Sequence, residues 1–139
     1  MADHFEWQDH YSVGVEEIDS DHKKLAGILN RVVHAVSNHH GKEAVSAIFE
    51  ELTRHTIRHF EHEEWLMKGA LYPGLEDHRA AHEFLVDKLK VFHDDFQNER
   101  IDMMSVANFL VDWLLVHVLG EDARLGLFLR EQGIDWEER

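Results

Sequence analysis

The sequence contains no cysteine among its 139 residues. Disulfide frameworks, thiolate nucleophiles, iron-sulfur clusters and cysteine-ligated zinc are therefore excluded together. Any metal site in this chain must be built from nitrogen and oxygen ligands.

Basic residues and long apolar runs are also scarce. The chain has 14 basic and 28 acidic residues, and its formal net charge of -14 would repel nucleic acid and anionic lipid, so we expect neither as a partner. The first residues lack a basic segment followed by an apolar run, and no later stretch approaches the roughly 18 apolar residues of a membrane span. We therefore expect a cytoplasmic protein without a membrane segment.

Proline occurs once, at Pro73, and the glycines fall mostly between periodic segments, which favours an all-α chain. At 16.3 kDa the chain is long enough for one domain, residues 1–139. Apolar periodicity predicts an up-down-up-down antiparallel four-helix bundle. An N-terminal arm (1–18) would precede the bundle and a short C-terminal helix (together 19–131), and a tail (132–139) would follow.

The four long helices are predicted by their apolar stripes and by the turns between them. Their expected bounds are Ser20–Ser37, Lys42–Lys68, Leu75–Phe96 and Met103–Val118. Asp19 or Ser20 is the expected N-cap of the first helix. The short C-terminal helix would contain Leu125, Phe128 and Leu129.

Thirteen histidines are spread along the chain. Histidine and carboxylate side chains occur at inward positions of the expected helices, where a soluble bundle would normally place Leu, Ile or Phe. The seven that stand out are His22, His59, Glu63, His78, His82, His117 and Asp122.

Two pairs among the seven have the spacing of neighbours on one helix face. His59 and Glu63 are four residues apart, as are His78 and His82. Their Cβ atoms would lie about 6 Å apart, which suits two ligands of one metal site.

His117 and Asp122 are five residues apart, which is about 140° around an ideal α-helix. Both can face inward only if the helix ends or distorts between them, and Gly120 is the expected place. Elsewhere the bundle brings candidates level with each other. His22 and His59 each lie about 17 residues, or roughly 25 Å, from their shared turn. We therefore expect all seven side chains to converge at one end of the bundle.

Five imidazoles and two carboxylates exceed the four ligands of tetrahedral zinc and are too rich in nitrogen for calcium or magnesium. They suit two six-coordinate iron ions. The two carboxylates would bridge the irons, and their charge, with that of a bridging oxide or hydroxide, would offset most of the metal charge.

With their neighbours, these residues resemble the hemerythrin family, and within it the single-domain bacterial form, bacteriohemerythrin. The resemblance covers nearly the whole chain. It is carried by Trp7, by Val13-Gly14-Val15 and Ile18-Asp19 before His22, by His59-Phe60 with Glu63-Glu64 and Met67, by His78 with His82, and by Trp113-Leu114 with His117 and Asp122.

The resemblance implies a non-haem di-iron centre that binds dioxygen reversibly. The histidines would divide three to two between the irons, and the carboxylates would bridge them. The implied ligands are His78, His82 and His117 on one iron, His22 and His59 on the other, and Glu63 and Asp122 on both. Dioxygen would bind at an open position of the second iron.

Reversible binding requires a dry apolar pocket, because water or a stray proton donor would leave an inert diferric form. Helical phase predicts that the residues near this pocket are Ile28, Leu29, Phe60, Trp113 and Leu114. Glu64 lies about 100° from Glu63 around the helix, so we expect it not to ligate.

The eight remaining histidines fit no part of this pattern, and most are expected to be solvated. They are His4, His10, His34, His39, His40, His55, His62 and His93. His55 lies one turn before His59 on roughly the same face, so it is either solvated or a hydrogen-bond partner near the ligands.

The leading hypothesis is a binding protein that stores, delivers or senses dioxygen. The alternative is a di-iron enzyme acting on dioxygen, peroxide or nitric oxide. Five histidines with two carboxylates make a site poorer in charge than the four-Glu, two-His oxygen-activating sites of ferritin-like proteins, which favours binding. A third class is an interaction protein whose ligand state a partner detects. The sequence does not identify a protein recipient.

Overall fold

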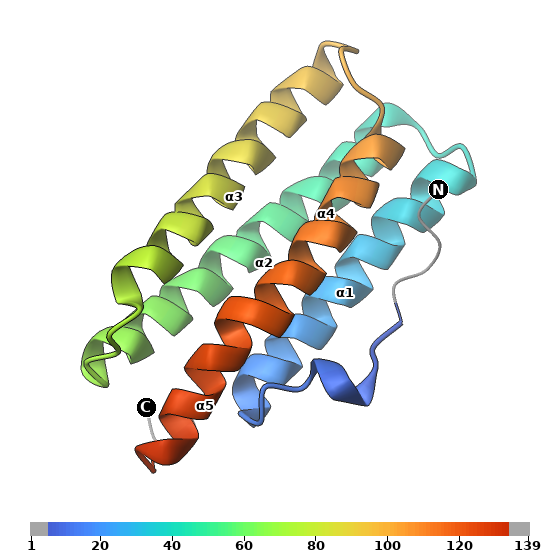
Figure 1. Cartoon of the computed structure of the whole chain (residues 1–139). Helices are drawn as coiled ribbons and strands as arrows, with labels where there is room; N and C mark the ends of the chain where they lie inside the picture. Colours follow the sequence, from blue (N-terminus) through green and yellow to red (C-terminus); the bar gives the residue numbers. More distant parts are fainter. Residues whose placement is uncertain (1–5, 134–139) are drawn as a thin grey trace.

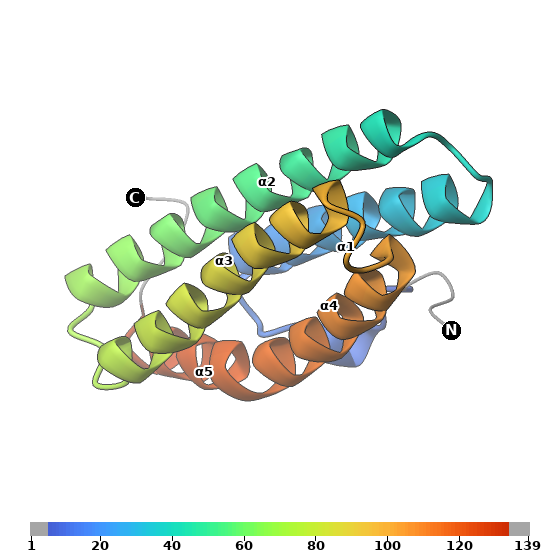
Figure 2. The same ribbon diagram turned by 90° about the horizontal axis from the view of Figure 1, so that it is seen from above.

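The structure is a computed structural model that describes residues 6–133. Four long helices alternate in direction, and a fifth continues the last of them (Figure 1). They are α1 (Glu16–Ser37), α2 (Lys42–Gly69), α3 (Leu75–Gln97), α4 (Met103–His117) and α5 (Ala123–Glu131). In the view from above, α1 and α2 lie side by side, and α3 and α4 pack against this pair (Figure 2). The predicted all-α four-helix bundle is confirmed.

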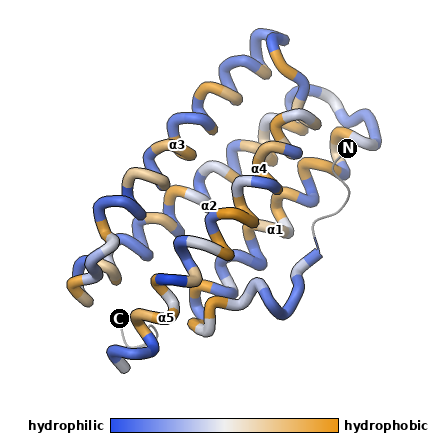
Figure 3. The backbone as a smooth tube through the Cα atoms, in the orientation of Figure 1, coloured by the Kyte–Doolittle hydropathy of each residue, from blue (hydrophilic) through white to orange (hydrophobic). Residues whose placement is uncertain are grey.

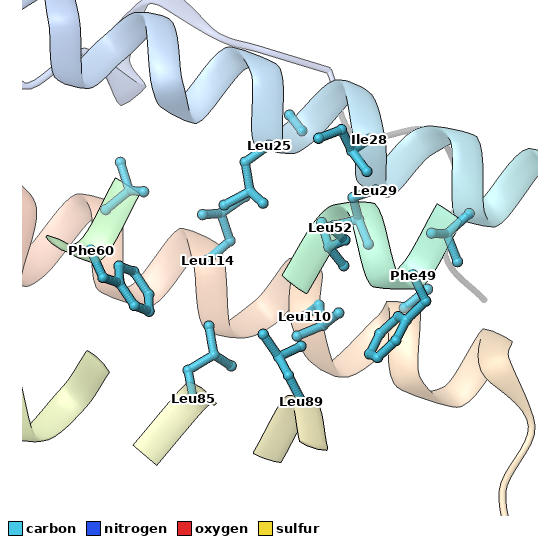
Figure 4. Close-up of a cluster of buried hydrophobic side chains, with 14 of the residues drawn as sticks. Leu25, Ile28, Leu29, Phe49, Leu52, Phe60, Leu85, Leu89, Leu110 and Leu114 are labelled. Carbon is cyan, nitrogen blue, oxygen red and sulfur yellow. The ribbon is translucent and has the colours of Figure 1, made fainter. Parts of the chain in front are cut away.

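The interior is built from the apolar stripe of each helix. Hydrophobic and hydrophilic segments alternate along the helices, as the predicted periodicity requires (Figure 3). Leucines from all four helices meet on the bundle axis, and the side chains of Leu85 and Leu89 point from α3 toward those of Leu114 and Leu110 on α4 (Figure 4). Burial of these stripes supplies most of the driving force for helix association.

The N-cap predicted for the first helix is wrong. Helix α1 begins at Glu16, and its N-cap residue Val15 has no side-chain cap. Three acidic side chains in the first turn stabilise the start through the helix dipole. Asp19 has another role: its carboxylate accepts hydrogen bonds from the Val13 N–H (2.8 Å) and the Ser12 hydroxyl (2.5 Å). It thereby fixes the arm to the helix.

The arm accordingly ends before Glu16 instead of at residue 18. In the described part it contains one short 3₁₀ turn, η1 (Asp9–Tyr11). Of the features expected at the ends of the chain, His4 and residues 134–139 lie outside the described residues.

Helix α4 ends at His117 and is followed without a loop by a π-helical turn, η2 (Val118–Asp122), which leads directly into α5. The resulting helix, Met103–Glu131, has 29 residues, and its most apolar 18-residue window has a mean hydropathy of 1.6. By length and composition alone it could span a membrane, so the expectation that no stretch approaches such a segment was too strict. In this bundle the same helix packs on α1 and supplies buried polar groups.

The arm is held against α5 by a close backbone approach. Arg130 donates a hydrogen bond from Nη1 to the Val13 carbonyl at 2.5 Å. A Cβ atom on Gly126 would lie 2.2 Å from the same carbonyl oxygen. Only glycine permits α5 and the arm to approach this closely.

We therefore expect Gly126→Ala to lower the free energy of unfolding by about 1–3 kcal/mol, the usual cost of overpacking. The matched control is Gly27→Ala, because a Cβ there meets nothing within 4 Å on an exposed face of α1. That change should stabilise the protein by about 0.5–1 kcal/mol through helix propensity. Urea unfolding of both variants tests the prediction, and equal effects would contradict it.

Candidate metal centre

The structure brings all seven sequence-predicted residues together at one end of the bundle. Each is at least 97% buried, and the two carboxylates are completely so. Helix α1 contributes His22; α2 contributes His59 and Glu63; α3 contributes His78 and His82; α4 and η2 contribute His117 and Asp122. The convergence expected from residue counting along antiparallel helices is present.

The seven residues form two overlapping groups that could each hold a metal ion. In each group the candidate ligand atoms lie within 4.8 Å of one another. Glu63 and Asp122 belong to both groups. The larger group adds His78, His82 and His117, and the smaller adds His22 and His59. This division matches the three-to-two arrangement implied by the resemblance.

The two oxygens of Glu63 face different groups. Oε2 lies 3.1 Å from His59 Nε2, whereas Oε1 lies 3.1 Å from Nε2 of both His78 and His82. A carboxylate placed this way can bridge two metal ions.

Asp122 has the same arrangement. Its Oδ2 atom is 2.9 Å from His22 Nε2, and its Oδ1 atom is 2.9 Å from His78 Nε2 and 3.0 Å from His117 Nε2. The π-helical turn makes this possible, because hydrogen bonds from i to i+5 bring residues five apart onto one face. The expected distortion between His117 and Asp122 is therefore present, and it includes Gly120.

Most of the converging atoms have no hydrogen bond. Nε2 of His22, His59, His82 and His117 makes none, and neither do Glu63 Oε2 and both oxygens of Asp122. Buried polar atoms are rarely left unpaired, since each costs about 1–3 kcal/mol. His78 Nε2 and Glu63 Oε1 form the one internal hydrogen bond among these atoms that the described structure gives, at 3.1 Å. An imidazole and carboxylate donor set that converges with most of its atoms unbonded fits divalent transition-metal ions.

Three further carboxylates hold the outer nitrogens of the histidines. Nδ1 of His59 is 2.8 Å from Asp21, Nδ1 of His82 is 2.8 Å from Glu64, and Nδ1 of His117 is 2.9 Å from Glu121. In each pair Nδ1–H donates, so the tautomer leaves Nε2 directed at the cluster.

The roles of Asp21 and Glu121 were not predicted from the sequence, and Glu64 was expected only not to ligate. Glu64 does lie outside both groups of candidate ligands. The available signal was adjacency, since each of the three carboxylates is next in sequence to a cluster residue. A neighbour along a helix points about 100° away, where it can reach a histidine from another direction.

His55 contacts the backbone beside the cluster. Its Nε2 atom donates to the carbonyl oxygen of Asp21 at 3.1 Å. Because the Asp21 side chain accepts from His59, His55 is one residue removed from the cluster. It ties α2 to α1 at this level through the Asp21 backbone.

The electrostatic setting favours charged forms in the absence of metal. Burial alone would lower the pKa of His59, but Glu63 and Asp21 raise it to about 10. Burial would also lower the pKa of His78 and His117. Asp122 and Glu63 instead raise the pKa of His78 to about 9, and Asp122 raises that of His117 to about 10. Burial would raise the pKa of both carboxyl groups, yet the surrounding imidazoles hold them well below their usual range.

Aromatic rings cover two of the histidines. Phe60 stacks on His82 with ring centroids 3.7 Å apart, and Trp113 stacks on His117 at 4.5 Å. Of the five residues expected near an apolar pocket, Leu29, Trp113 and Leu114 line a cavity of about 20 Å³ in the core. Phe60 and Ile28 are buried outside its lining.

The comparisons with known proteins agree with this geometry. The family model described as the hemerythrin HHE cation binding domain matches residues 13–127. A bacteriohemerythrin of Stenotrophomonas maltophilia is 29% identical over 133 residues, which cover 90% of this chain and 86% of that protein. A bacteriohemerythrin of Pseudomonas aeruginosa is 31% identical over 122 residues, which cover 86% of this chain and 78% of that protein.

A crystal structure of wild-type hemerythrin has the same fold. It aligns with a TM-score of 0.83 at 22% identity and covers 90% of this chain and 97% of that one. The family model extends over most of the chain and includes all seven cluster residues. The chain therefore belongs to the hemerythrin family.

Proposed function

We propose that this protein binds dioxygen reversibly at a di-iron centre held by the seven-residue cluster. Hemerythrin-family membership implies dioxygen binding at a di-iron site. One observation carries the proposal for this chain: two buried ligand groups share Glu63 and Asp122, each of which presents one oxygen to either side.

In the proposed centre, His78, His82 and His117 would hold one iron, and His22 and His59 would hold the other. Glu63 and Asp122, which belong to both groups, would contribute to holding both irons. The smaller histidine set would give its iron fewer protein ligands, so we expect dioxygen to bind on that side. When bound, the iron pair supplies the electrons that dioxygen binding requires.

The remaining roles belong to the chain's own side chains. Glu63 and Asp122 offset metal charge inside a bundle where water cannot do so. Asp21, Glu64 and Glu121 hold the Nδ1 protons and so orient three imidazoles. Phe60 and Trp113 cover the histidine rings on which they stack and limit the access of water.

The surroundings of the cluster favour binding over turnover. The nearby cavity of about 20 Å³ has room for a very small molecule, and its lining is leucine-rich. Storage, delivery and sensing of dioxygen all fit such a site. An enzyme acting on dioxygen, peroxide or nitric oxide is the alternative, and absorption spectra before and after exposure to oxygen distinguish the two functions.

The purified protein is expected to contain two irons per chain. After anaerobic reduction, exposure to oxygen should produce a charge-transfer absorption band, and removal of oxygen should abolish it. Metal analysis and absorption spectra of one sample test both points. Direct conversion to a stable diferric spectrum would favour the enzyme, and absence of iron would contradict both functions.

Glu64→Gln is expected to weaken iron binding by about 10- to 100-fold, because the partner that orients His82 loses its charge. Glu61→Gln is the control, since Glu61 is exposed on the same helix and is not a candidate ligand. The rate of iron loss to a chelator provides the measurement. Equal rates in the two variants would refute the role of Glu64.

Removal of the metal should make stability depend strongly on pH. His59, His78 and His117 have pKa values of about 10, 9 and 10 in the metal-free fold, against an ordinary value of 6.5. Their stabilisation is complete below pH 6.5 and is lost as the pH rises through 9 to 10. Glu63 and Asp122 have lowered pKa values, so their stabilisation is lost as the pH falls below about 4.

The free energy of unfolding of the metal-free protein should therefore be highest near pH 5 to 6.5 and decline on both sides. Urea unfolding of chelator-treated protein across this range measures it. The iron-loaded protein is the control, because metal-bound imidazoles do not take up protons. A metal-free protein with constant stability between pH 6.5 and 10 would contradict the prediction.

A further inference from the structure

The cavity beside the cluster is formed by two regular layers of side chains. On each of the four long helices, the first-layer residue is three positions along the chain from a cluster histidine, on the side toward the middle of the bundle. It consists of Leu25, Thr56, Leu85 and Leu114. The second layer lies four residues further and consists of Leu29, Leu52, Leu89 and Leu110. Trp113 completes the lining. Thr56 is the one position in the two layers that is not leucine.

Thr56 is 1% exposed, and its hydroxyl donates a hydrogen bond to the carbonyl oxygen of Leu52, one turn away, at 2.8 Å. The hydroxyl proton is therefore already used. A buried water requires two to four polar partners, whereas this cavity offers little more than the remaining lone pairs of one oxygen. A volume of about 20 Å³ could hold one water, but walls with so few polar partners favour a small apolar molecule over water.

Side-chain size explains why the cavity exists at this level. The other three members of the first layer are leucines, and Figure 4 shows Leu85 pointing toward α4 and Leu114 pointing toward Leu25. A threonine side chain is shorter than leucine by one carbon along its length. A fourth leucine at position 56 would extend into the space that the cavity occupies.

We propose that Thr56 opens a dry, gas-holding cavity beside the histidine layer and so sets how readily an apolar diatomic gas reaches the centre. The cavity follows from packing alone. Only the identification of the gas as dioxygen rests on the proposed function.

Three substitutions separate the size of Thr56 from its hydroxyl. Thr56→Val keeps the shape and removes the hydroxyl, Thr56→Ala enlarges the cavity, and Thr56→Leu fills it. Thr53→Leu is the matched control, because Thr53 makes the same type of bond, to the Phe49 carbonyl, but does not line the cavity. The probe is xenon, which binds apolar cavities without chemistry.

Xenon NMR titration of the as-purified, metal-loaded protein measures the binding. The Val variant should bind xenon as the wild type does, the Ala variant more tightly, and the Leu variant not at all; the Thr53→Leu variant should be unchanged. Should the Leu variant fail to fold, tighter binding by Ala than by Val tests the same point. Wild-type xenon affinity in the Leu variant, or equal affinities in Ala and Val, would overturn the inference.

Stopped-flow mixing of the reduced protein with dioxygen separates this inference from the proposed function. Slower oxygen uptake in Thr56→Leu, but not in Thr53→Leu, supports both. A xenon series as expected with no oxygen-dependent band in any variant would refute dioxygen binding and leave the cavity assignment supported. Reversible oxygen binding at an unchanged rate in Thr56→Leu would overturn the role of Thr56 alone.

Discussion

Two fully buried carboxylates determine the design of this end of the molecule. Glu63 and Asp122 have no exposed surface, and isolated charges at such depth would cost far more than the few kcal/mol by which a domain is stable. Their burial requires positive charge on all sides. Five imidazoles converge on them, and the unpaired Nε2 and carboxylate atoms form two groups that could each hold a metal ion.

The backbone adjusts to meet this requirement. An uninterrupted α-helix would turn Asp122 away from His117, but the π-helical turn brings both to the cluster. The same turn allows the chain to continue into α5 without a loop. Helix α5 then packs against the arm through Gly126 and Arg130. The position of one carboxylate is therefore linked to the way in which the N-terminal segment docks.

Much of the fold and the cluster could be predicted from the sequence, because periodicity and spacing encode them directly. Residues four apart share a helix face, and equal distances from a turn place residues level in antiparallel helices. Asp21 and Glu64 could not be found this way, since they reach His59 and His82 across helix interfaces. Glu121 could have been, because it lies four residues after His117. The start of α1 was misplaced because Asp19 resembles an N-cap while its side chain accepts from the arm. The gap beside Thr56 depends on three-dimensional packing that no single-helix pattern specifies.

The environment of the cluster differs sharply between its outer and inner sides. On the outer side, the Asp21, Glu64 and Glu121 side chains are 22–28% exposed, so water screens their charge while they hold the imidazole protons. On the inner side, leucines and one internally bonded threonine offer almost no hydrogen-bonding capacity. The three outer carboxylates already orient the imidazoles of His59, His82 and His117. No polar side chain is therefore needed on the inner side for this purpose, and the inner wall can remain apolar. Separation of the two tasks allows a highly charged centre to adjoin a dry cavity in one small bundle.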